Sequence, residues 1–151
     1  MKVAIGCDHA GIELKDAVRE VLKEQGAQVI DLGTHERDSV DYPDYGAAVA
    51  RAVVSGEADL GVVLCGTGIG ISIAANKVPG ARAALCHDTF SARMSREHND
   101  ANILAMGARI VGSGLAQEIV RAWLGASFAG GRHQRRIEKL NELDRVEEVH
   151  G

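Results

Sequence analysis

Short apolar runs alternate with amphipathic segments along the chain, and this alternation constrains the fold more than any other feature. The run 60–65, Leu-Gly-Val-Val-Leu-Cys, is nearly all apolar, as expected for a strand of a parallel sheet that is covered on both faces. Further strands are expected at 3–5, 28–32, 81–86 and 102–106. The pattern predicts an α/β fold, a single-domain, doubly wound, Rossmann-like three-layer sandwich with a parallel sheet of about five strands.

Helices are expected between these strands. Gly26 is a suitable end for the first helix, and Asp88 is a suitable N-cap for the helix after the fourth strand. A Gly130-Gly131 joint precedes the last helix and is expected to let its first turn swing toward the strand ends. The other helices expected are one with Leu14, Ala17, Val18, Val21 and Leu22 on its apolar face, one opened by Pro43, and those at 69–77, 113–124 and about 132–145.

Length, charge and cysteine content exclude several classes of protein. A chain of 151 residues is about one domain long, so we expect one domain over residues 1–151. The net charge of −4 argues against a nucleic-acid or anionic membrane partner. The three cysteines, Cys7, Cys65 and Cys86, form no C-x-x-C motif, so neither a disulfide framework nor a metal site is expected. Free thiols, no apolar run of membrane length and no signal peptide predict a cytoplasmic protein.

The segment after the first strand combines glycines with two titratable side chains. It reads Gly-Cys-Asp-His-Ala-Gly at 6–11, with the G-x-x-x-x-G spacing of a P-loop. The next residues are Ile12 and Glu13 rather than Lys and Ser or Thr, which excludes a nucleoside-triphosphate site. Asp8 and His9 remain as candidates at a strand end, where doubly wound folds bind their ligands. A helix-capping aspartate and a surface histidine are the alternative.

The segment after the third strand, Cys-Gly-Thr-Gly-Ile-Gly at 65–70, is the strongest single signal. Its alternating glycines let backbone N–H groups face a ligand in front of a helix N-terminus, which suits a phosphate or an enediolate oxyanion. The G-x-G-x-G run follows the wrong strand for a dinucleotide fingerprint. A C-x5-R phosphatase loop is disfavoured because position 71 is Ile71. A helix N-terminus favours the thiolate form of Cys65, and inert packing of a buried cysteine is the alternative.

Two polar segments lie later in the chain. The stretch 96–102 offers His98, which can act as an acid or base near neutral pH, and the amide of Asn99; a solvated loop is the alternative. Arg132 and Arg136 are four residues apart on one helical face, which suits a phosphate. The segment 35–38 carries no pattern that we can interpret.

Six of these segments together resemble type B ribose-5-phosphate isomerase. The resemblance runs in the same order from Val3 to about Leu143, and the ordered set is far more specific than any one motif. The family also contains galactose-6-phosphate isomerase subunits and isomerases of allose and tetrose phosphates. The matching segments are 6–11, Asp-Tyr-Pro at 41–43, 65–72, Ala-Ala-Asn-Lys at 74–77, 95–102 and Gly-Gly-Arg-His at 130–133.

The resemblance implies an aldose–ketose isomerase of the pentose phosphate pathway that interconverts D-ribose 5-phosphate and D-ribulose 5-phosphate through an enediolate, without a cofactor or metal. It implies that Cys65 is the base, assisted by Thr67, and that His98 is the acid that opens the sugar ring, with Asp8 opposite it. Relatives without the cysteine carry a glutamate at the position of Ile71, so this chain falls in the cysteine branch. The implied substrate contacts are Asp8, His9, Gly66, Thr67, Gly68, Ile69, Gly70, Asn99, Arg109, Arg132 and Arg136.

The resemblance further implies a homodimer or tetramer with active sites between subunits. His98 and Asn99 would then reach the site that holds the partner's Cys65, and the last helix would pack on the partner subunit. Three alternatives stay open: an isomerase of another sugar phosphate, a non-catalytic module that binds a phosphorylated ligand, and a Cys–His hydrolase with a covalent thiol intermediate.

Overall fold

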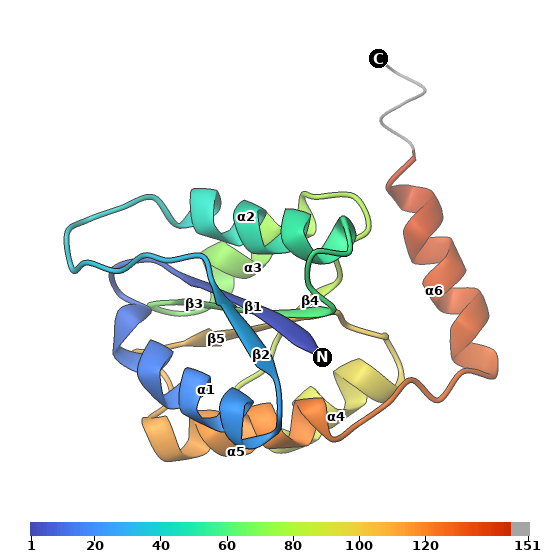
Figure 1. Ribbon diagram of the computed structural model, residues 1–151. Coiled ribbons are helices and arrows are strands. Elements are labelled where there is room, and N and C mark those ends of the chain that lie inside the picture. The colour runs from blue at the N-terminus through green and yellow to red at the C-terminus, as the bar shows by residue number, and fades with distance from the viewer. Residues whose placement is uncertain (146–151) are drawn as a thin grey trace.

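A five-stranded parallel sheet forms the centre of the computed structural model, which describes residues 1–145 (Figure 1). The strand order is β2-β1-β3-β5-β4, and the expected single-domain doubly wound fold is confirmed. The strands are β1 (Lys2–Cys7), β2 (Gln28–Asp31), β3 (Leu60–Cys65), β4 (Ala83–Leu85) and β5 (Ile103–Gly107). The helices are α1 (Ile12–Glu24), α2 (Tyr42–Val54), α3 (Ile69–Asn76), α4 (Thr89–Glu97), α5 (Ser113–Leu124) and α6 (Arg132–Leu143).

Two sets of helices bury the two faces of the sheet. Helices α1, α4 and α5 cover one face, where Val18 and Trp123 are fully buried, and α2 and α3 cover the other, where Val49 and Ile71 are fully buried (Figure 1). Strand β3 is central, paired with β1 and β5, and its side chains alternate between the two cores, so both of its faces are buried. This position explains its nearly all-apolar sequence.

Strands β1 and β4 each differ in length from the expectation by three residues, and β2 by one. The expected strand 3–5 extends to Cys7, because β1 pairs on both sides and its register continues to Cys7 opposite Leu64. The expected strand 81–86 shortens to β4, because the Arg82 N–H donates to the side chain of Asn102 at 2.7 Å instead of joining the ladder. The expected N-cap is confirmed, since the Asp88 side chain accepts from the Ser91 N–H.

Helix α6 stands beside the sheet rather than on either face (Figure 1). Ile137 is its one buried residue, whereas Leu140 and Leu143 are exposed. The helix is attached to the domain near its end by polar contacts, in which Arg82 donates to Asn141 at 3.3 Å and the Gly80 N–H donates to Asp144 at 2.8 Å. Much of the apolar surface of α6 is therefore open to solvent in the single chain.

Candidate active site

A cavity of about 390 Å³ lies at the carboxyl edge of the sheet, where β1, β3 and β5 end. All of its lining residues except Ala10 and Tyr42 are site residues expected from the sequence. The lining residues are Asp8, His9, Ala10, Tyr42, Cys65, Gly66, Thr67, Ile69, Gly70 and Arg109. The structure thus brings one large part of the expected site into a single cavity.

Cys65 differs from the other two cysteines in its surroundings. Its Sγ accepts a hydrogen bond from the Gly68 N–H at 3.1 Å, directly in front of the start of α3. Gly68 takes a φ of 78°, and a Cβ there would lie 2.8 Å from the carbonyl carbon of Met106, so only glycine places this amide correctly. Burial raises the pKa of Cys7 and Cys86 to about 11, which keeps both as thiols.

Asp8 has a structural contact as well as a place in the cavity. Its Oδ1 accepts from the N–H groups of Ala10 and Gly11 at 3.0 and 2.9 Å, and the residue is buried. The carboxylate therefore fixes the turn between β1 and α1 while lining the cavity. The neighbouring His9 is half-buried and accepts a hydrogen bond from the Val40 N–H through Nδ1 at 3.1 Å.

A positive charge lies beside the glycine loop. The Arg109 N–H donates to the Gly66 carbonyl at 3.0 Å, which joins the loop after β5 to the loop after β3. The guanidinium lies over the loop, with Nη1 3.0 Å from the point that a Cβ on Gly66 would occupy. Backbone amides, the start of α3 and an arginine together form a site that suits an anionic ligand.

Gly68 lies in the same loop as Cys65, and the remaining expected residues lie at the opposite, amino edge of the sheet. His98 and Asn99 follow α4 and precede β5, and they line a second cavity, of about 400 Å³, with Arg136. Strand β5 runs between the two edges and spans about 16 Å, at about 3.3 Å per residue. The two cavities share no lining residue, and Arg132 at the start of α6 lines neither. Within one chain, therefore, the structure does not bring His98 to Cys65.

The expectation that the Gly-Gly joint turns the last helix toward the carboxyl strand ends is wrong. The Ala129 N–H donates to the Glu97 carbonyl at 3.0 Å, which ties the joint to the end of α4. The ring of His133 then stacks on that of His98, with centroids 4.3 Å apart and planes 13° apart. The first turn of α6 is thereby held at the amino edge.

The stretch 96–102 is an ordered helix end rather than a solvated loop. The Arg96 side chain is 15% exposed, lies over the Trp123 ring and donates to the Ala101 carbonyl. Burial lowers the pKa of Arg96. These contacts give His98 a fixed position at the amino edge.

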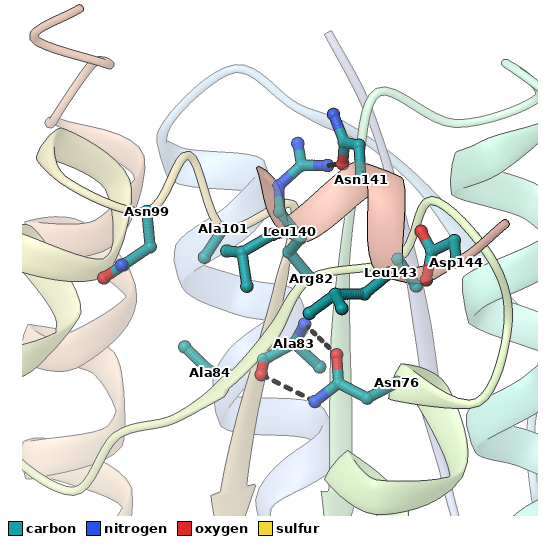
Figure 2. Close-up of a pocket in the computed structure, with 11 residues that line it drawn as sticks. Asn76, Arg82, Ala83, Ala84, Asn99, Ala101, Leu140, Asn141, Leu143 and Asp144 are labelled. Carbon is teal, nitrogen blue, oxygen red and sulfur yellow. Dashed lines mark hydrogen bonds between the residues drawn. The ribbon is translucent and has the colours of Figure 1, made fainter. Parts of the chain in front are cut away.

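A third hollow, of about 490 Å³, separates α6 from the edge strand β4 (Figure 2). Leu140 and Leu143 face it from α6, and Asn76 lies on the opposite side (Figure 2). The Asn76 side chain donates to the Ala83 carbonyl and accepts from the Ala83 N–H, at 3.0 and 2.8 Å. The asparagine of the segment 74–77 thus pairs with the free edge of β4 as a neighbouring strand would.

Two aromatic residues that line these cavities, Tyr42 and His133, are absent from the set of site residues expected from the sequence. Tyr42 lines the first cavity and packs so closely on Gly70 that a Cβ there would lie 2.6 Å from its ring. The segment 41–43, quoted for the family resemblance, was the signal that could have identified it. His133 lines the second cavity, and the Gly-Gly-Arg-His segment contained it. Burial and the neighbouring His98, Arg132 and Arg136 lower the pKa of His133.

The sequence is similar to those of known proteins over nearly the whole chain. Residues 3–140 match the model of the Ribose/Galactose Isomerase family. The chain belongs to this family. It is 52% identical to ribose-5-phosphate isomerase B of Escherichia coli, covering 95% of this chain and 96% of that one. It is 43% identical to D-erythrulose-4-phosphate isomerase of Pectobacterium atrosepticum, covering 97% of each.

Solved structures give the same result. Ribose-5-phosphate isomerase B of Clostridium thermocellum superimposes with a TM-score of 0.94 at 58% identity and covers 100% of both chains. The resemblance to type B ribose-5-phosphate isomerase is therefore confirmed. Within residues 1–145, no helix is long and apolar enough to cross a membrane. The same described residues contain no group of three His, Cys, Asp or Glu side chains that could hold a metal ion.

Proposed function

We propose that this member of the isomerase family interconverts D-ribose 5-phosphate and D-ribulose 5-phosphate. The observation that carries the proposal is the placement of Cys65 in a cavity lined by an anion-binding loop, with the Gly68 amide 3.1 Å from its Sγ. A proton beside a carbonyl is removed by a positioned base while donors hold the developing oxyanion, and this cavity offers both. The names of the relatives from E. coli and C. thermocellum support ribose 5-phosphate as the substrate.

The proposed reaction passes through an enediolate. The Cys65 thiolate takes the proton from C2 of the open-chain aldose, and the C1–C2 double bond forms as O1 becomes an oxyanion. A proton then passes from O2 to O1, the thiol returns its proton to C1, and O2 becomes the ketone oxygen. Thr67 assists the base, and the amides from Gly66 to Gly70 hold the enediolate oxygens. Asp8 and His98 exchange the protons that open the ring.

The separation of the two cavities supports a shared active site. In this proposal a second copy of the chain brings His98, Asn99, Arg132 and Arg136 to the cavity that contains Cys65. The half-exposed apolar side of α6, with Leu140 and Leu143 beside the hollow of Figure 2, then packs on the partner subunit of a homodimer or of a tetramer built from it. His9, Arg109, Arg132 and Arg136 bind the phosphate and hydroxyl groups.

The proposal includes no metal or cofactor, and exhaustive chelation is expected to leave turnover unchanged. The three free cysteines suit a reducing compartment, so we infer a cytoplasmic enzyme of the pentose phosphate pathway. The family also includes a relative named D-erythrulose-4-phosphate isomerase, so the number of carbons in the substrate is the part of the proposal to test first.

The test is turnover on a panel of four-, five- and six-carbon sugar phosphates, with exchange of the C2 proton into solvent measured in parallel. Highest kcat/KM on ribose 5-phosphate, with proton exchange and no trapped thioester, is the expected result. Higher kcat/KM on allose 6-phosphate, galactose 6-phosphate or a tetrose phosphate would keep the mechanism and change the substrate. Binding without exchange would indicate a non-catalytic module, and a covalent thiol adduct would indicate a hydrolase.

A further inference from the structure

The connection from β2 to α2 runs along the start of α1, and contacts in antiparallel order join the two segments. This connection contains the segment 35–38, which the sequence alone did not explain. Two of the contacts are made by backbone atoms of the connection. From the turn before α1 into the helix, the contacts are His9 with Val40, Glu13 with Arg37, and Lys15 with Thr34.

Lys15 forms the innermost of these contacts and is only 4% exposed. Its Nζ lies 2.8 Å from the Thr34 carbonyl, 2.8 Å from Oδ2 of Asp31 and 3.1 Å from Nδ1 of His35. An ammonium group has three protons, so these acceptors satisfy it completely. A buried, fully bonded charge fixes its partners firmly, because moving any of them would leave the charge without compensation.

Asp31 completes this anchor from the end of β2. Its Oδ1 accepts from the Gly33 N–H at 3.0 Å while its Oδ2 faces Lys15. Burial opposes ionisation of the carboxyl, but the hydrogen bonds from Lys15 and Gly33 outweigh it, and the pKa of Asp31 is lowered. The carboxylate is therefore charged at neutral pH, and the beginning of the connection is held by an ion pair.

The outermost contact sets the proton position on His9. The Val40 N–H can donate to Nδ1 only when that nitrogen carries no proton, so the single proton of the neutral ring lies on Nε2. If both ring nitrogens carried protons, the N–H at Nδ1 would point at the N–H of Val40, and the two donors would repel each other. His9 also lines the cavity that contains Cys65, so its Nε2–H is the donor left for a ligand.

We propose that Lys15 is a positioning residue for substrate binding. By anchoring residues 34–40 it keeps the Val40 amide against Nδ1 of His9, and His9 then serves as a neutral donor to the substrate phosphate through Nε2–H. This inference rests on the proposed function for the identity of the ligand, but the hydrogen bond and its dependence on Lys15 do not. The Glu13–Arg37 pair has side chains 60% and 74% exposed, so it contributes little and offers a matched control on the same helix.

The experiment uses uniformly ¹⁵N-labelled protein and measures the scalar coupling through the hydrogen bond between the Val40 nitrogen and Nδ1 of His9. Wild type and Glu13→Gln are both expected to show the coupling. Their KM values are expected to agree within about twofold. Lys15→Met is expected to lose the coupling and to raise KM about tenfold, with a smaller change in kcat, because the lost contact is to the phosphate. Val40→Pro removes the donor itself and is expected to have the same effect.

Each result decides the inference. A coupling that persists in folded Lys15→Met, or an unchanged KM after the coupling is lost, would overturn it. If Lys15→Met does not fold, Asp31→Asn weakens the same anchor and is judged by the same two criteria, while Val40→Pro tests the hydrogen bond to His9 alone. If wild type turns over no sugar phosphate, the proposed function fails, and affinity for inorganic phosphate replaces KM; equal phosphate affinity in wild type and Val40→Pro would then overturn the inference separately.

Discussion

The separation of Cys65 and His98 across the sheet leads directly to a complementation test, in which two inactive variant subunits are mixed and activity is measured. We expect Cys65→Ala and His98→Asn each to be inactive alone. In a symmetric dimer with shared sites, equal mixing and random reassociation make about half of the dimers mixed. Each mixed dimer has one site with both native residues and one site with neither. The mixture should therefore recover about one quarter of wild-type activity.

The matched control places both substitutions on one chain and mixes that chain with an equal amount of wild type. With shared sites, only wild-type dimers are active, and activity should be about one quarter of an all-wild-type sample. If each site were built within one chain, the control would instead retain about half, and the first mixture would recover nothing. Mixed dimers are then isolated by different affinity tags; with shared sites, those of the first mixture should show about half of wild-type activity and those of the control none. No activity in verified mixed dimers of Cys65→Ala and His98→Asn would refute the shared site.

Three further predictions test the chemistry, the phosphate site and the loop. Cys65→Ala should lower kcat by about 10²–10⁴-fold in single-turnover and steady-state assays, and near-normal turnover would exclude Cys65 as the base. Arg136→Ala should raise KM about ten- to a hundredfold for the phosphorylated sugar only; an equal effect on the unphosphorylated sugar would make it structural. Gly107→Ala places a Cβ 2.5 Å from Thr67 and should lower kcat/KM about a hundredfold, whereas Gly112→Ala, with open space around it, should change it less than about twofold.

The architecture was predictable because the sheet is parallel and buried. The central strands of such a sheet appear in the sequence as apolar runs, and β3 gives the clearest one. The start of β4 was not predictable, because it depends on a side chain distant in sequence: Asn102 captures the N–H of Arg82, which therefore does not join the ladder. The position of α6 was not predictable either, since its small buried surface leaves its placement to a few tertiary contacts.

Half of the candidate site followed from a topological rule. Loops that come after parallel strands share one edge, so Asp8, Cys65 and Arg109 could be expected to meet. The same rule applied in reverse places His98 and Asn99, which precede β5, at the other edge. The sequence therefore already contained the reason why His98 and Cys65 lie at opposite edges of the sheet within one chain. Only the structure added the second cavity and the stacking of His133 on His98.

The segment 35–38 carried no interpretable pattern, and the residues that flank it, Thr34 and Val40, make their contacts through backbone atoms. Thr34 contributes its carbonyl to Lys15, and Val40 contributes its N–H to His9. Every residue has a carbonyl and all except proline have an N–H, so no side-chain pattern in the connection reveals these contacts. The visible sign was on the other side of the contact, where a lysine occupies a position on the buried face of α1. A lysine within an apolar helical stripe has to find acceptors, and Lys15 finds them at the end of β2 and in the connection that holds His9.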